Sequence, residues 1–485
     1  MIDLEDYFAY FILKTSDDNR PIPTFAFGQK DYVSGVHEKW TSDPETQPEV
    51  ADAEDPSEPE FTHQSALTEA LKASVDFGLA QHELIWAATV APVAIRMAMA
   101  RGDVIGPIKE KSPKIFDDEH CEIYGLSEAE YAEMISKYQR YDLTKKGVER
   151  FPSATLLSFV ATFDTLVVDI LSKMLRLQSD WLERSERTIS LARLAAANSL
   201  DEIIQEQIAE EVYQFSRGSH SEQAGYIKRN FGIDIEKDWK RWPDYIEIFE
   251  RRNLVAHGER NFNSRYVRIC ISAGHKGSAE LLGKKVELTA NYLRQSLNVL
   301  LEFAVLLSFS LFRKFVKEVE EQAFTNLNEA VFTLTQRGHY VVAERLASYA
   351  LGLKGAKITS EIRLMLIVNR ASAMRHDGRE EEAKAFLEKE DWTAVSDLFK
   401  ICVASVSGDV KKFEELLPKL NASGEINAHS LLTWPCFSFV RKDAQAQAVI
   451  KNVFNIDLGK EVSGDEAKTL EAVEGPPDDD GSTVH

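Results

Sequence analysis

Apolar residues recur three and four positions apart through most of the chain, which is the spacing of one face of an α-helix. The longest such pattern spans Ser153–Leu177, where we expect Ser153 to cap the first turn of a buried helix. The same spacing predicts helices over four further segments, namely 64–101, 200–215, 245–256 and 290–320, the last of them capped by Thr289. The pattern therefore predicts a mainly α-helical protein.

Two short segments interrupt the helical pattern. Residues Tyr266–Ile271 alternate in polarity as a strand does, and Lys285–Leu288 could pair with them across a glycine-containing turn. Residues 1–40 combine an aromatic cluster with prolines, which suggests short strands or turns. We therefore expect a helical bundle with a small β-hairpin excursion.

Beyond residue 326 the pattern changes to repeats. Gly338, Gly378 and Gly408 stand 40 and then 30 residues apart, close to the about 34 residues of a helix–turn–helix repeat. Small alanines between them would let neighbouring helices pack closely. The region resembles a degenerate tetratricopeptide array, and an irregular helical bundle is the alternative. Such arrays present a concave surface, so we expect these repeats to bind a protein partner or trigger.

Composition divides the chain further. Residues 41–61 hold four prolines and eight acidic residues but no basic one, which predicts a solvated linker. Residues 461–485 predict a disordered acidic tail. The whole chain then reads as an N-terminal segment of unassigned role (1–40), the linker 41–61, a helical region 62–150, a core domain 151–320, helical repeats 321–460 and the tail 461–485.

Charge and cysteine content narrow the class of protein. The 485 residues include 57 Lys and Arg against 78 Asp and Glu, a net charge of −21, which argues against a coat for nucleic acid or anionic membrane but allows a local basic patch. The four cysteines show no short pairing and the first residues are acidic, which favours a cytoplasmic protein without disulfides or a signal peptide. The apolar run Val299–Phe312 is shorter than the ~20 residues of a membrane span and carries Glu302, so we expect a buried helix and no membrane contact.

The strongest chemical signal is Arg252 and Asn253 followed by His257. Five helical positions advance about 500°, so the arginine and histidine lie about one turn apart and could reach one phosphate. The guanidinium matches phosphate oxygens, the imidazole suits proton transfer near neutrality, and the amide could orient the histidine or contact ribose. Because RNA supplies its own nucleophile, the 2′-hydroxyl, this set could cleave RNA without a metal ion.

Basic and aromatic residues surround this motif. Between Tyr226 and Arg268 there are ten Lys and Arg against seven Asp and Glu, and such segments can hold single-stranded nucleic acid. Core aromatics with solvated charges are the alternative. Our candidate RNA-binding residues are Arg251, which could instead hold Glu250, together with Arg260, Arg265 and Tyr266.

Other polar residues give weaker signals. His120 and Cys121 beside three acids lack a second pair at zinc spacing, so we expect neither a metal site nor a cofactor. Four further histidines have no partner at motif spacing, and we interpret them as surface or structural residues, namely His220, His275, His339 and His376.

Residues 151–318 taken together resemble the HEPN family of all-α domains. The resemblance lies in the long apolar helix at Ser153–Leu177, the helix end with Arg252, Asn253 and His257, the following Asn263–Tyr266, and the long closing helix. It implies a metal-independent endoribonuclease with Arg252, Asn253 and His257 as catalytic residues, leaving a 2′,3′-cyclic phosphate. Family members are often toxins or antiviral effectors, and the resemblance implies a homodimer with both motifs at one cleft. Some members are scaffolds, so a non-catalytic dimerising adaptor is the alternative.

Overall fold

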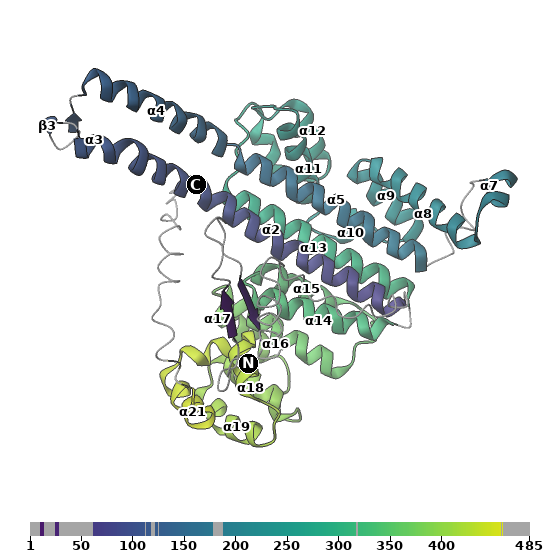
Figure 1. Ribbon diagram of the computed structural model, residues 1–485. Helices are drawn as coiled ribbons and strands as arrows, with labels where there is room; N and C mark the ends of the chain where they lie inside the picture. Colours follow the sequence, from purple (N-terminus) through teal and green to yellow (C-terminus); the bar gives the residue numbers. More distant parts are fainter. Residues whose placement is uncertain are drawn as a thin grey trace, which may run out of the picture. The chain divides into compact units, whose positions relative to one another are not determined.

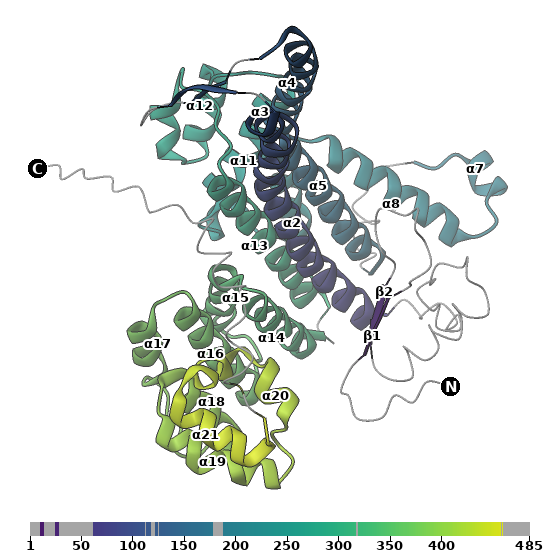
Figure 2. The same ribbon diagram turned by 60° about the vertical axis from the view of Figure 1, so that its left-hand side comes forward.

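The computed structural model is mostly helical, as the apolar spacing predicts (Figures 1 and 2). It describes residues 10–13, 25–28, 62–111, 113–117, 122–124, 126–177, 188–316, 319–456 and 458. The chain forms two compact units, Met1–Thr62 and His63–His485. The linker expected at 41–61, the tail expected at 461–485, and His120 with Cys121 lie outside the described residues.

The first unit contains one described antiparallel pair of strands. Strand β1 (Tyr10–Leu13) pairs with β2 (Phe25–Gly28), with Tyr10 opposite Gly28. This agrees with the short strands suggested for residues 1–40.

Long helices form the core of the second unit. Helix α2 (His63–Met99) packs on α5 (Phe151–Leu177) and on α13 (Ala290–Phe315), and α11 (Trp242–Ala256) packs on the last two. The predicted helices are confirmed, except that the helix predicted for 290–320 ends at Phe315 and that Ser153 does not cap α5. The helix begins at Phe151, because Pro152 fits the first helical turn, where its missing N–H has no partner to lose.

The end of α2 continues into a helical hairpin, which we call the arm (residues 84–148). It runs through the π-helical turn η1 (Ala100–Ile105), α3 (Gly106–Lys111) and the antiparallel strands β3 (Lys114–Asp117) and β4 (Glu122–Tyr124). Helix α4 (Glu128–Val148) then returns beside α2 and η1. The capping box of Ser127 and Glu130 begins α4. The helical region predicted for 62–150 therefore also contains a strand pair that the apolar spacing does not reveal.

Four helices are described between α5 and α11, in residues 188–241. They are α7 (Leu191–Ala196), α8 (Leu200–Arg217), α9 (His220–Phe231) and α10 (Ile235–Asp238). Helix α8, predicted for 200–215, packs its apolar face on α5. Ser219 caps α9 through a capping box with Glu222, which fixes His220 as the first residue of that helix.

The predicted β-hairpin after α11 is wrong. Residues Ser264–Ser272 form helix α12, in which the Asn263 side chain accepts a hydrogen bond from the backbone N–H of Tyr266. Tyr266 and Cys270 are four positions apart and both buried, so the apparent alternation conceals one helical face. The 3₁₀ helix η2 (Lys276–Leu281) follows α12. In this part of the described chain, β-pairing is limited to one isolated bridge between Asn261 and Lys285.

Helix α13 confirms two expectations. Its cap is Thr289, whose hydroxyl accepts from the backbone N–H of Tyr292, and the apolar run Val299–Phe312 is buried.

By length and composition alone, three helical segments are apolar enough to cross a membrane, namely His63–Lys111, Ala129–Leu177 and Ala290–Phe315. The most apolar stretch of the last is 83% buried within the protein, whereas that of the first is only 11% buried.

The C-terminal region consists of helix pairs. Gly338, Gly378 and Gly408 adopt positive φ angles and stand at the turns within three successive pairs. The pairs are α14 (Glu320–Gln336) with α15 (Tyr340–Gly352), α16 (Ser360–His376) with α17 (Glu380–Leu387), and α18 (Asp397–Ser407) with α19 (Val410–Ala422). Shorter elements follow, namely α20 (Ala428–Thr433), η4 (Pro435–Ser438), η5 (Val440–Lys442) and α21 (Ala444–Phe454).

These helix pairs do not share a single core. The first pair packs on α13, and its buried residues, such as Phe324 and Leu346, belong to the same apolar core as α2 and α5. A second core begins at Ile367 in α16 and includes Phe413 and Phe437. The first pair therefore leans on the long helix α13, as expected for an array too short to be stable alone.

The turn at Gly378 gives a direct stability prediction. Its φ is +80°, and a Cβ placed there would meet no atom within 4 Å, so Gly378→Ala carries only the conformational penalty of a left-handed residue. We expect the free energy of unfolding to fall by about 1–2 kcal/mol in urea titrations. Gly352→Ala, in similarly open space at the end of α15 without a positive φ, should instead leave stability unchanged or raise it. Equal effects of the two variants would contradict this reading of the turn.

Candidate functional site

The last turn of α11 carries the predicted motif. Arg252 and Asn253 lie within the last five residues of the helix, and His257 is the C-cap residue, whose backbone N–H donates to the Asn253 carbonyl. Gly258 follows with a φ of +71°, and the N–H of Glu259 closes the helix end on the Leu254 carbonyl at 3.0 Å. The His257 side chain is exposed and makes no hydrogen bond or ion pair with the residues that the structure describes.

The guanidinium of Arg252 is partly exposed and already has acceptors. Its Nη2 donates to Oδ2 of Asp164 at 3.0 Å, and its Nη1 donates to Oδ1 of Asn253 at 3.2 Å. Asp164 stands on α5, 88 positions earlier in the chain. An anion that approaches Arg252 must therefore compete with a carboxylate of the same chain.

A second histidine shares that carboxylate. Nε2 of His220, at the start of α9, lies 3.4 Å from Oδ1 of Asp164, and the imidazole ring stacks on Phe249 of α11. The sequence interpretation of His220 as a surface or structural residue missed this contact. The one available signal was Asp164, an acid within the otherwise apolar pattern of α5, because such a residue usually has a partner.

Glu250 is the second carboxyl near the motif. It accepts from Nδ2 of Asn253 at 3.4 Å. Burial raises the pKa of the Glu250 carboxyl, against the opposing attraction of Arg265. A carboxylic acid with a raised pKa can act in proton transfer nearer to neutral pH.

This shift predicts a pH-dependent stability. Because the folded-state pKa of Glu250 lies above its usual 4.5, its ionised form is disfavoured in the folded protein, and the stability it contributes at low pH is lost as pH rises through the folded pKa. We expect Glu250→Gln to unfold at higher urea concentration than wild type at pH 7, with the difference vanishing below about pH 4.5. The exposed neighbour Glu259 provides the control variant, Glu259→Gln, and a pH-independent gain for Glu250→Gln would contradict the assignment.

Arg251 and Tyr266, predicted to contact RNA, are occupied within the protein. The Arg251 side chain is 12% exposed, its Nε donates to Oε1 of Glu247 at 2.7 Å, and its guanidinium lies 3.8 Å from the ring centre of Tyr292. The hydroxyl groups of Tyr266 and Tyr292 both donate to Glu247. The partner of Arg251 is thus Glu247 and not Glu250, and we assign Arg251 and Tyr266 a role in joining α11 to α12 and α13.

The other two candidate RNA-binding residues are exposed. Arg265 lies in the first turn of α12, near Glu250, and Arg260 lies in the segment after α11. Arg260 lines a cavity of about 940 Å³, together with Arg150 and Lys285. The remaining wall is formed by the start of α5, the end of α11 and the segment 285–288, with Ser153, Ala154, Leu157, Val255, Gly258, Glu259, Asn261, Val286 and Leu288.

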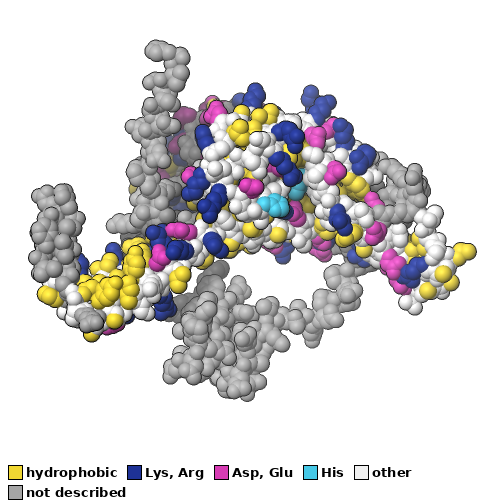
Figure 3. Space-filling model, turned by 90° about the horizontal axis from the view of Figure 1, so that it is seen from above, with side chains coloured by type: hydrophobic (Ala, Val, Ile, Leu, Met, Phe, Trp, Pro, Cys, Tyr) yellow, Lys and Arg dark blue, Asp and Glu magenta, His cyan; other side chains and the backbone are white. Residues whose placement is uncertain are grey.

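The cavity lies at the end of α11, but Arg252, Asn253 and His257 are not among the residues that line it. His257 is the residue before Gly258, which lines it. Its volume is within the range of ligand sites, and three basic side chains against one acidic side chain suit a phosphate-bearing ligand. Figure 3 shows Lys and Arg side chains, interspersed with acidic ones, around histidine side chains on one face of the molecule. Among the described residues, no three His, Cys, Asp or Glu side chains are grouped closely enough to hold a metal ion.

Comparisons with known proteins add no family to this geometry: no protein-family model, no curated protein and no solved structure matches the chain.

Proposed function

We propose that the protein is a metal-independent endoribonuclease of the HEPN type. The observation that carries this proposal is the placement of Arg252, Asn253 and His257 at one helix end, where His257 is exposed and the next residue, Gly258, lines a cavity with three basic side chains. These are the groups needed for cleavage by the 2′-hydroxyl of RNA: a proton-transfer group and fixed positive charge for the phosphate.

In this proposal the RNA phosphate takes the place of Asp164 on Arg252. His257 accepts the proton of the attacking 2′-hydroxyl or delivers one to the leaving 5′-oxygen, and a second group supplies the opposite transfer. Glu250 is supported for that second role by its raised pKa and its contact with Asn253. A second copy of the motif in a homodimer would supply it equally, and we propose that the protein acts as a homodimer.

Cleavage of purified RNA tests the chemistry. Wild-type protein incubated with total RNA in excess EDTA should cut it and leave 2′,3′-cyclic phosphate ends or their opened products, which end-specific enzymatic labelling identifies. Heat-denatured protein from the same preparation is the control for contamination. Cleavage that strictly needs added magnesium, or products with 3′-hydroxyl ends, would contradict the mechanism.

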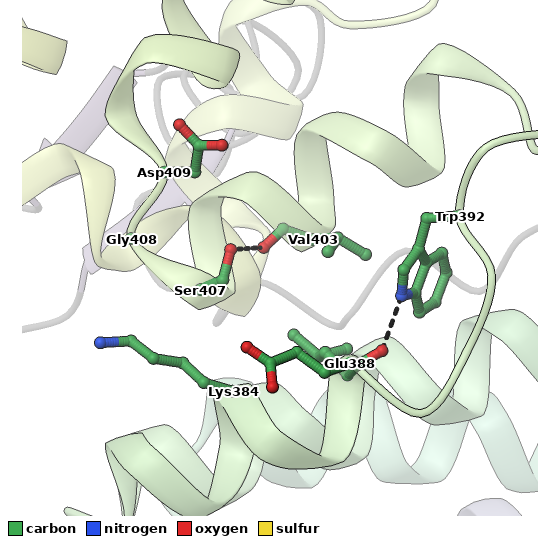
Figure 4. A pocket seen from close by; sticks show the side chains of 8 residues that line it. Lys384, Glu388, Trp392, Val403, Ser407, Gly408 and Asp409 are labelled. Carbon is green, nitrogen blue, oxygen red and sulfur yellow. Dashed lines mark hydrogen bonds between the residues drawn. The ribbon is translucent and has the colours of Figure 1, made fainter.

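The helix pairs support a partner-binding role. Between the second and third pairs lies a cavity of about 430 Å³ lined by Lys384, Glu388, Trp392, Val403 and Asp409 (Figure 4). The indole N–H of Trp392 donates to the Leu387 carbonyl at 2.8 Å, which holds the ring at the cavity wall. A fixed aromatic ring with charges of both signs suits a peptide. We propose that the tetratricopeptide-like repeats bind a protein trigger and that the protein is a cytoplasmic toxin or antiviral effector, by analogy with the HEPN family.

One observation favours a second function, a non-catalytic dimerising adaptor. Arg252 is paired with Asp164 inside one chain, as it would be if it served stability alone. In that case wild-type protein would leave RNA intact, and Asp164→Asn and Arg252→Ala would each lower the free energy of unfolding with a strong coupling between them. If the protein is instead a nuclease, Arg252→Ala should abolish cleavage even where the fold persists.

A further inference from the structure

The arm carries several large apolar side chains that are exposed. Trp86 is 55% exposed, Val93 is 47% exposed and Met97 is 48% exposed. Figure 3 shows apolar side chains gathered over the arm, at the left. A contiguous apolar patch of this kind marks an interaction site more often than a solvated surface.

The spacing of the exposed apolar residues indicates that another helix could pack along them. Trp86, Val90, Val93 and Met97 follow each other by four, three and four positions, the alternation with which one helix packs along another in a coiled coil. We call these four residues the arm seam. Each follows by one position a residue that is buried (Ile85) or that lines a cavity against Pro152 and Leu293 (Thr89, Pro92 and Arg96), and Val93 of the seam lines the same cavity. The seam therefore lies about 100° further round the helix.

The charges of α4 argue against lipid as the cover. Helix α4 lies beside α2 and η1, so a bilayer that received the arm would also receive Glu133, Lys137, Arg140, Asp142, Lys145 and Lys146. Charged side chains in hydrocarbon are strongly unfavourable. The arm, residues 84–148, carries nine Lys and Arg against ten Asp and Glu, so it also has no excess positive charge to attract anionic lipid.

The same charges favour a second copy of the chain. The first half of α4 is acidic, with Glu130 of the capping box and Glu133, and its second half is mainly basic, with Lys137, Arg140, Lys145 and Lys146. Two ion pairs within the helix, Glu133 with Lys137 and Asp142 with Lys146, leave Arg140 and Lys145 as the basic residues without such a partner inside α4. A two-fold axis perpendicular to α4 pairs the two copies of the helix antiparallel, which brings the acidic half of one copy against the basic half of the other, whereas parallel pairing would place like charges together. The arm is nearly neutral within a chain of net charge −21, so self-association through it meets little of the repulsion that other surfaces would meet.

We propose that the arm is a self-association surface, through which two copies of this chain pair along the arm seams with α4 against α4 of the partner. The antiparallel pairing separates the two Val148 ends of α4, and with them the cavities lined by Arg150, so this dimer does not place both motifs at one cleft and does not depend on ribonuclease activity. Dimerisation would remove Trp86, Val93 and Met97 from water in both copies at once.

Two substitutions in the arm seam test the proposal through the molecular mass of the protein in solution. In sedimentation equilibrium at micromolar concentration the full chain should be a dimer, and Val93→Glu with Met97→Glu should raise the dissociation constant at least ~100-fold, since four charges enter one apolar contact. The substituted side chains are half exposed, so circular dichroism and the thermal midpoint of the monomer should be unchanged. Leu191→Glu, on α7 at a position 82% exposed, is the matched control and should leave the dimer intact.

A charge exchange on α4 tests the antiparallel arrangement separately. Glu133→Lys and Arg140→Glu should each weaken homodimers, and a mixture of the two variant chains should form heterodimers more tightly than either variant forms homodimers. A monomeric wild-type chain, a dimer indifferent to Val93→Glu with Met97→Glu, or a mixture without heterodimer preference would overturn the proposal. So would a monomer that floats with phosphatidylcholine vesicles through Trp86, because lipid would then cover the seam.

Discussion

Replacing His257 by alanine should lower RNA cleavage by ~10²–10⁴-fold, the usual consequence of losing a proton-transfer group. The fold should survive, because the His257 side chain is exposed and pairs with none of the described residues. The loss should appear in kcat, since a group that moves protons acts in the transition state more than in binding. Cleavage in EDTA by wild type and variant, with thermal unfolding of both, measures the two effects.

Two companion variants show whether the effect is specific to this position. His63→Ala removes an exposed histidine at the start of α2 and should cleave like wild type. Asp164→Asn should change the RNA concentration needed for half-maximal cleavage, because Asp164 holds the guanidinium that the phosphate must engage. Retention of activity by His257→Ala within about twofold, far below the loss expected for an acid or base, would remove the histidine from the chemistry.

The sequence alone predicts the helix pairs of the C-terminal region well, for a physical reason. Gly338, Gly378 and Gly408 adopt the backbone conformation that glycine accepts at no steric cost, so turn chemistry identifies their places before any packing is known. The cap at Thr289 and the buried run Val299–Phe312 are predicted by equally local rules.

The errors arise where tertiary contacts override local patterns. Tyr266–Ile271 alternates in polarity, but Asn263 caps a helix there and Tyr266 is held by Glu247, a contact that spans 19 positions. At the candidate site the motif itself predicts the position of Arg252, Asn253 and His257 on one helix end. It does not predict that Asp164 and His220 join them, because those residues come from α5 and α9 and no spacing rule relates them to α11.

The sequence also does not predict that the arm seam is exposed, for a different reason. An apolar stripe at helical spacing predicts a buried face equally well whether its cover comes from the same chain or from another. Only the exposure of Trp86 and Met97 in the folded chain distinguishes the two cases.

The largest stability effect should come from Glu247. Its carboxylate is 5% exposed and accepts from Arg251, Tyr266 and Tyr292, so Glu247→Leu leaves the Nε of Arg251 and two hydroxyl groups without their acceptor, while Nη1 of Arg251 keeps the Glu287 carbonyl. We expect the free energy of unfolding to fall by about 3–5 kcal/mol, the usual cost of removing one partner of a buried ion pair. Urea titration followed by circular dichroism measures it, and a loss below about 1 kcal/mol would mean that water solvates Arg251 after all.

A paired substitution separates this structural role from RNA binding. Glu247→Leu combined with Arg251→Met replaces the buried pair by apolar side chains, which is often close to neutral for stability, so the double variant should recover much of the loss. Since neither side chain then carries charge, the double variant should still cleave RNA if Arg251 serves only to join α11 to α12 and α13. A folded double variant that has lost cleavage, while Arg260→Ala retains it, would instead return Arg251 to the RNA-binding role that its position beside the motif first suggested.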